Sequence, residues 1–210
     1  MKISILISIK LLASVLLLAL FFLSIIQTVE AQTTGTFTDP RDRETYTTIT
    51  IEDPLAGIKV TWMSQNLRYR IANSWAYDNQ ERYEKKLGRL YTWQAAIGAC
   101  PAGWRLPSDA DWSALINKFG GNRYASSALK GTKGWNNNGN GTNISGFSAL
   151  PGGHRDLNGI FQKIGDEGFW WSATEDGSNT AWSRLLFYGD GVGRRNLLKN
   201  TAISVRCLRD

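Results

Sequence analysis

The sequence predicts an α+β protein with an antiparallel sheet, two helices and long irregular loops. Three observations support this fold class. Strand-like segments gather near both ends, two helical segments lie between them, and a Gly- and Asn-rich run precedes the last strands. Strands that occur in runs, instead of alternating with helices, favour antiparallel pairing.

The first segment, Met1–Ala31, has the pattern of an export signal. Lys2 and Lys10 give a positive start, an uncharged run of 16 residues follows from Leu11, and small residues flank Glu30 at the predicted cleavage site. A retained membrane anchor is the alternative, but that run is shorter than the roughly 20 residues a spanning helix needs. We expect cleavage, no stable membrane span afterwards, and a secreted, periplasmic or cell-surface location.

The remainder is long enough for one domain. Residues 32–42 are polar and predict a flexible leader, and residues 43–210 form the expected single domain. The formal net charge of +6 is scattered along the chain, with Arg194-Arg195 as its nearest approach to a basic run. Nucleic-acid binding needs a clustered basic face, so the composition argues against that class of partner.

The first half of the domain contains two strands and both helices. The β-branched run at 45–51 and the alternating run at 58–63 predict a hairpin, and residues 66–86 show no clear period and predict a loop. Good helix formers predict a helix over 91–99. A second helix is expected from Ser108, which can cap it, to the stop at Gly120-Gly121.

The second half is loop-rich and then strand-like. The Gly- and Asn-rich run over 131–146 favours turns with positive φ. Strands are predicted over 169–174, 181–188 and 202–208. In the last of these, Ile203, Val205 and Cys207 face one way, whereas Ser204 and Arg206 face the other.

Two cysteines remain after the predicted signal, Cys100 and Cys207. An even number in an exported chain indicates one disulfide, and two reduced buried thiols are the alternative. The pair encloses 106 residues, so closing this loop is expected to stabilise the fold by about 4–5 kcal/mol.

A series of short sequence blocks runs along the chain from Gly35 to Asp210. The most specific block is Cys100–Ser108, with the sequence CPAGWRLPS. The blocks are Gly35–Asp42, Trp62–Leu67, Gly88–Trp93, Cys100–Ser108 with Asp111 and Trp112, Gly146–Gly153, Trp170–Glu175 and Ser204–Cys207. Together and in this order they resemble the Fibrobacter succinogenes major paralogous domain family.

This resemblance implies a C-type-lectin-like fold, similar to that of sulfatase-modifying proteins. It also implies that Cys100, at the end of the first helix, bonds Cys207 on the last strand. Members of the family occur mainly as surface and secreted proteins of bacteria. Because the family's molecular role is largely unassigned, the resemblance predicts a fold more firmly than an activity.

Catalytic and metal chemistry have few candidates. His154 is the one histidine, and a Ser-His-Asp arrangement would have to use it with Asp156. The family usually has Tyr at this position, which argues for a packing role. One His and two bonded Cys cannot build a zinc or copper site. We expect no metal or other cofactor, although the Asn-rich loop leaves calcium open.

Aromatic residues outside the predicted core suggest a ligand site, because sugars and peptides stack on Trp and Tyr. The candidate ligand-binding residues are Trp75, Tyr77, Trp135, Asn137, Asn140, His154 and Trp182. The leading hypothesis is a non-catalytic recognition or adhesion module that binds glycan or a cell-surface protein through residues 135–176. A structural or assembly component of the cell envelope is the alternative, and a modifying enzyme ranks third. The sequence does not indicate an oligomeric state.

Overall fold

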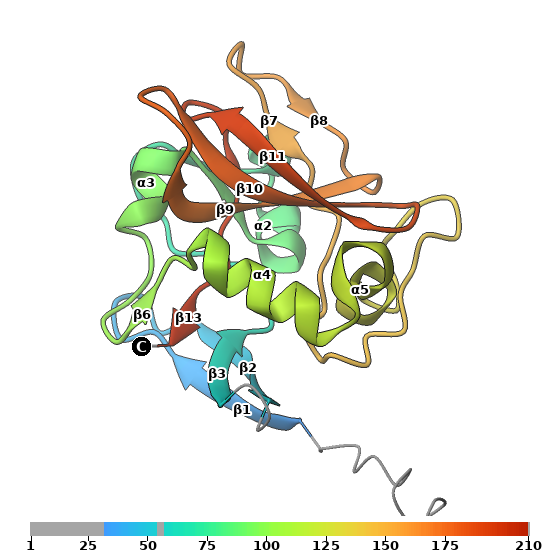
Figure 1. Cartoon of the computed structure of the whole chain (residues 1–210). Coiled ribbons are helices and arrows are strands. Elements are labelled where there is room, and N and C mark those ends of the chain that lie inside the picture. The colour runs from blue at the N-terminus through green and yellow to red at the C-terminus, as the bar shows by residue number, and fades with distance from the viewer. Residues whose placement is uncertain (1–31, 54–56, 210) are drawn as a thin grey trace, which may run out of the picture. The chain divides into compact units, whose positions relative to one another are not determined.

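A computed structural model describes residues 32–53 and 57–209, so the predicted export signal lies outside the described residues. The described part has mixed α+β structure, mostly antiparallel sheet with four α-helices (Figure 1). Within it, no helix combines the length and the apolar composition needed to cross a membrane. The α+β class is as predicted, but the number of helices is twice the number expected.

The first sheet joins strands from the two ends of the domain, in the order β1-β2-β3-β13-β6. Each neighbouring pair is antiparallel. Its strands are β1 (Thr33–Thr38), β2 (Thr45–Asp53), β3 (Ile58–Met63), β6 (Trp104–Arg105) and β13 (Leu208–Arg209). The predicted hairpin of the second and third strands is therefore present.

The flexible leader predicted over residues 32–42 was wrong for most of its length. Thr33 to Thr38 pair in register with the start of β2. The Phe37 ring packs 5.0 Å from that of Trp104, and Asp39 is fully buried, where Arg41 holds its carboxylate. β-branched Thr residues and one aromatic anchor outweigh the polar composition that suggested a leader.

The second sheet has the order β11-β10-β9-β12-β5-β4. β9 and β12 pair in parallel, and the other neighbours are antiparallel. Its strands are β4 (Ser74–Ala76), β5 (Arg89–Tyr91), β9 (Glu167–Glu175), β10 (Thr180–Phe187), β11 (Val192–Leu198) and β12 (Ile203–Ser204). A separate small hairpin joins β7 (His154–Arg155) to β8 (Phe161–Gln162).

The helices are α2 (Glu81–Leu87), α3 (Trp93–Ile97), α4 (Asp109–Lys118) and α5 (Gly121–Leu129). The second predicted helix is confirmed in α4, where Ser108 and Asp111 form a reciprocal capping box. The first is shorter than predicted, because Tyr91 belongs to a strand. Gly120-Gly121 ends α4 as expected but starts α5, and α2 lies in the predicted loop over 66–86. A short 3₁₀ turn over Tyr77–Asn79 precedes α2.

α4 lies between the two sheets, where large aromatic side chains form the core (Figure 1). The Trp112 ring is 4.9 Å from Trp62 on β3 and 6.4 Å from Trp170 on β9. Phe147, from the long loop, packs edge-on against both Trp62 and Trp112. This aromatic contact holds the long loop against the sheets and positions the cavity described below.

The disulfide between Cys100 and Cys207 is present, with the two Cα atoms 5.9 Å apart. It connects the end of α3 to the chain just before β13. The single strand predicted over 202–208 was wrong. The segment is divided between β12 in the second sheet and β13 in the first, and residues 205–207 between them are not strand. Ser204 and Arg206 are as deeply buried as their apolar neighbours.

Candidate functional site

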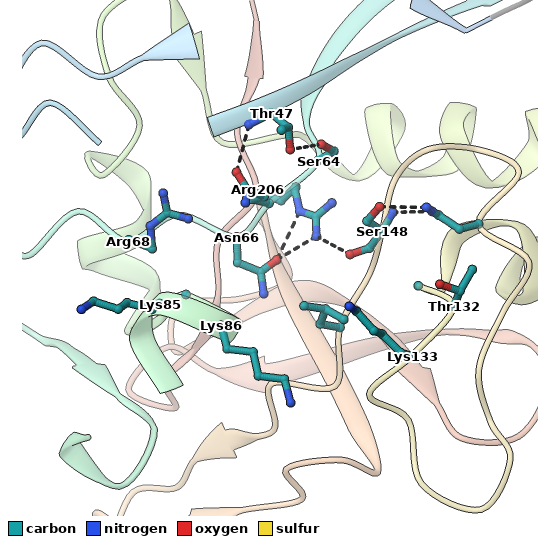
Figure 2. Close-up of a pocket in the computed structure, with 15 residues that line it drawn as sticks. Thr47, Ser64, Asn66, Arg68, Lys85, Lys86, Thr132, Lys133, Ser148 and Arg206 are labelled. Carbon is teal, nitrogen blue, oxygen red and sulfur yellow. Dashed lines mark hydrogen bonds between the residues drawn. The ribbon is translucent and has the colours of Figure 1, made fainter. Parts of the chain in front are cut away.

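A cavity of about 280 Å³ opens between the start of β2, the end of α2 and the long loop that follows α5. Figure 2 shows Arg68, Lys85 and Lys86 on one side of it, Thr132 and Lys133 on the other, and Asn66 with Arg206 between them. The lining residues are Thr47, Ser64, Gln65, Asn66, Arg68, Lys85, Lys86, Gly88, Gly131, Thr132, Lys133, Asn143, Ser148, Leu150 and Arg206. We call this cavity the basic pocket.

Arg206 forms the base of the basic pocket, with only 1% of its surface exposed. Its Nε and Nη2 donate to Asn66 Oδ1 at 3.2 and 3.0 Å. Nη1 donates to the Phe147 carbonyl, Nη2 also reaches the Ser148 carbonyl at 3.4 Å, and the Phe147 ring stacks 4.1 Å from the guanidinium. Each of these acceptors is neutral.

Burial lowers the pKa of Arg206 to about 9, which still leaves the guanidinium charged at neutral pH. Desolvation is the one cause of this shift, and no described carboxylate lies close enough to offset it. A buried charge without an opposite charge is costly, and such groups are ordinarily paired. The base of the pocket therefore carries an uncompensated positive charge.

Asn66 connects the base of the pocket to the core. Its Oδ1 also accepts from the Trp170 indole at 2.9 Å, and its Nδ2 donates to the Leu87 carbonyl at 2.8 Å. Gly88 permits this contact: with a φ of +80°, a Cβ there would lie 2.6 Å from the Cβ of Asn66. Only glycine allows the end of α2 to approach so closely.

The opposite wall is a loop held in an unusual backbone conformation. Asn143 and Ser148 both have left-handed φ values, 55° and 54°. Asn143 Nδ2 donates to Ser148 Oγ at 2.9 Å, and Ser148 N donates to Asn143 Oδ1 at 2.7 Å. A non-glycine residue in this region is strained, and such strain persists where surrounding contacts hold it. The wall is thus a fixed part of the pocket.

The predicted ligand residues are not part of the basic pocket and lie in three separate places. The predicted region 135–176 does contribute Asn143, Ser148 and Leu150 to its lining. Within that region, Trp135 is buried and donates its indole N–H to the Ala149 carbonyl. Asn140 accepts from the Trp135 backbone, and Asn137 is exposed in a turn. Trp135 is therefore a core residue, contrary to the prediction.

Trp75, Tyr77 and His154 lie around the small β7–β8 hairpin. The guanidinium of Arg155 covers the Trp75 ring at 4.2 Å, and buried Tyr77 packs against Phe161. His154 is half-buried, and its ring meets that of Phe169 edge-on at 5.4 Å. Each of these rings thus packs against another side chain of the domain.

Trp182, on β10, is the remaining aromatic candidate. The guanidinium of Arg194 stacks over its ring at 3.3 Å. Arg194 also donates to Asp109, whose carboxylate binds Arg184 as well. Burial by itself would raise the pKa of Asp109, but the hydrogen bonds from these two arginines outweigh that effect and lower it. The ion pair with Asp109 thereby holds the Arg194 guanidinium in place over the Trp182 ring.

The residues considered for catalysis are held by structural contacts. Asp156 accepts from the backbone N–H groups of Asn158 and Ile160 and from Gln162, which fixes the β7–β8 turn. Burial lowers the pKa of His154, and its Nδ1 is buried without a hydrogen-bond partner among the described residues. Within residues 32–53 and 57–209, no group of three His, Cys, Asp or Glu side chains is arranged to hold a metal ion.

Comparison with known proteins identifies the domain. The model of the Fibrobacter succinogenes major domain matches residues 58–209. This stretch holds every lining residue of the basic pocket except Thr47. No curated protein and no solved structure matches the chain.

Proposed function

The chain belongs to the Fibrobacter succinogenes major domain family, and we propose that it is a non-catalytic recognition or adhesion module. It acts outside the cytoplasm, after export by its N-terminal signal, and binds a glycan. The ligand site is the basic pocket, in place of the aromatic faces that the sequence suggested. The C-type-lectin-like fold is part of this proposal and agrees with two sheets, a long irregular loop and a disulfide near the C-terminus.

The observation that carries the proposal is the construction of the basic pocket. A buried network of Asn66 and Arg206 forms its base, and paired side chains hold its loop wall. Preorganised polar groups of this kind bind a ligand without first being ordered, which lowers the cost of association. Its lining offers hydroxyls, amides and cations for hydrogen bonding, and those groups suit a hydroxylated ligand.

A variant in which a large side chain fills the basic pocket tests this function. Thr132 is exposed at the pocket and makes no side-chain hydrogen bond within the described residues, so Thr132→Trp fills the cavity without removing a contact. We expect the purified protein to retain cell-envelope polysaccharides in a pull-down and Thr132→Trp to lose them. Ser178→Trp, in the exposed turn between β9 and β10, is the matched control. Equal retention by all three proteins would remove the pocket as the ligand site.

An assembly role in the cell envelope is the second candidate, and one observation favours it. β1 forms an edge of the first sheet and is exposed along most of its length. An exposed edge strand is a template for pairing with another chain. Thr34→Pro would block such pairing at a position opposite Ile49, which does not line the pocket. Loss of self-association or envelope incorporation in this variant, with glycan retention intact, would favour assembly.

A further inference from the structure

The basic pocket has an excess of positive charge. Five of its lining residues are cationic, and no Asp or Glu lines it. Arg68 pairs with Glu44 at 2.8 Å, and Lys85 pairs with Glu81 at 3.1 Å. Lys86, Lys133 and Arg206 have no ion pair in the described part of the chain, so three of the five cations are uncompensated.

Arg206 is the most significant of these three cations, because it is buried and water does not hydrate its charge as it does that of a surface residue. Its described contacts use four of the five N–H hydrogens of a guanidinium, and each acceptor is neutral. Lys86 and Lys133 are exposed and lie on opposite sides of the cavity (Figure 2). The buried guanidinium lines the same cavity, so an anion bound there would be attracted by all three cations.

The remaining lining indicates which kind of molecule would carry the anion. It contains no aromatic ring, and Leu150 is its one large apolar side chain. The Thr132 hydroxyl and the Gln65 amide nitrogen make no hydrogen bond within the described residues. Such a lining gives little to the apolar side chains of a peptide, but it matches the hydroxyl groups of a sugar. The volume suits a single sugar unit, because it lies just below the roughly 300–1,000 Å³ of ordinary ligand pockets.

We propose that the basic pocket binds an acidic glycan, with the carboxylate or sulfate of one sugar unit placed between Lys86 and Lys133 above Arg206. This inference rests on the proposed function and specifies its ligand. The oxyanion supplies the negative charge that the described residues around Arg206 lack, and the polar lining receives the sugar hydroxyls.

Binding to defined polysaccharides tests the proposal. The probes are polygalacturonate for carboxylates, dextran sulfate for sulfate esters, and uncharged dextran. We expect the purified protein to bind one or both acidic polymers and not dextran, and Lys86→Gln/Lys133→Gln to bind at least about tenfold more weakly. Both lysines are exposed, so this double variant should fold normally, which its thermal unfolding will verify.

Arg123→Gln/Arg195→Gln is the control for non-specific attraction, because it removes the same charge from exposed positions of α5 and β11, away from the pocket lining. Equal weakening by the two double variants would overturn the proposal, as would failure to bind either acidic polymer. The proposal would also be overturned if the protein bound uncharged dextran, Thr132→Trp abolished this binding, and Lys86→Gln/Lys133→Gln left it unchanged. That last result would leave the recognition function intact, so the two failures are distinguishable.

Discussion

Arg206 Nε and Nη2 converge on a single atom, Oδ1 of Asn66, a residue 140 positions earlier in the chain. The same oxygen accepts from the Trp170 indole on β9. One amide thus joins the base of the basic pocket to the core of the second sheet. The stability of the domain and the shape of its proposed ligand site depend on the same contact.

Replacement of Asn66 by Leu should destabilise the protein strongly. The change deprives Arg206 and Trp170 of their shared acceptor, and an unsatisfied buried polar group costs about 1–3 kcal/mol, or more when it is charged. We expect the free energy of unfolding in urea to fall by about 3 kcal/mol or more. Asn122→Leu, at an exposed position of α5, is the control and should change it by less than about 0.5 kcal/mol. A small effect of Asn66→Leu would mean that solvent reaches the guanidinium.

Loss of the disulfide should destabilise the domain without changing its fold. Cys100 and Cys207 are 107 positions apart, and a cross-link across a loop of that length stabilises by about 4–5 kcal/mol in the chain-entropy model. Cys100→Ala/Cys207→Ala should therefore unfold at a lower urea concentration than the wild type, with a similar circular dichroism spectrum beforehand. A reducing agent should have the same effect on the wild type and none on the variant. Identical midpoints would show that packing holds these segments without the bond.

Gly88→Ala should destabilise the protein more than Gly103→Ala, a substitution at another glycine with a positive φ. Gly88 and Gly103 have similar φ values, +80° and +76°, but a Cβ has nothing within 4 Å at Gly103 and meets Asn66 at Gly88. Gly103→Ala measures the cost of a positive φ without a steric clash, about 1 kcal/mol. Gly88 also has a ψ of −166°, in a backbone region that essentially only glycine occupies, so the loss at Gly88 combines this backbone cost with the contact to Asn66. Thermal unfolding should show a clearly larger loss for Gly88→Ala, together with weaker glycan binding. Equal losses would indicate that the backbone at Gly88 relaxes and that α2 shifts away from Asn66.

His154→Phe should remove a pH dependence from stability. Burial lowers the pKa of His154 below its ordinary 6.5, so on acidification the unfolded chain binds a proton before the folded protein does. Stability is therefore complete above pH 6.5 and is lost as pH falls from there toward the lower folded pKa. Because His154 is the one histidine, the urea midpoint of the His154→Phe variant should change little with pH across this window. The new Phe side chain should keep the edge-on contact with Phe169. An unchanged slope would contradict this origin.

The sequence predicted correctly the elements that depend on neighbouring residues, such as a helix cap, an apolar helix face or a Gly- and Asn-rich turn region. The α4 helix has an apolar face, and the Ser108 cap lies directly before its first turn, so its start was predictable. The long loop was predictable from its Gly and Asn content. α2 and β1 were missed, because both are polar segments that become ordered by contacts with distant residues, such as Arg70 with Glu84 and Phe37 with Trp104.

The candidate site could not be found in the same way. Its lining comes from segments spread between Thr47 and Arg206, and the aromatic residues that drew attention are covered by neighbours. The adjacent pair Lys85-Lys86 is the local sequence feature that belongs to the lining, but two adjacent lysines are ordinarily solvated surface charge. Nothing local distinguishes Lys86, on the pocket, from any other exposed lysine.

The sequence by itself determined the family, the α+β class, the capped helix and the disulfide between Cys100 and Cys207. The family follows from the resemblance of the sequence blocks, the class and the helix from short-range propensity, and the disulfide from the number of cysteines together with that resemblance. Only the tertiary structure decided that Arg206 is buried at the base of a basic pocket. The alternating pattern around Arg206 predicts a strand, but residues 205–207 form none, and whether the Arg206 side chain meets water or the Phe147 loop depends on chain segments far away in sequence.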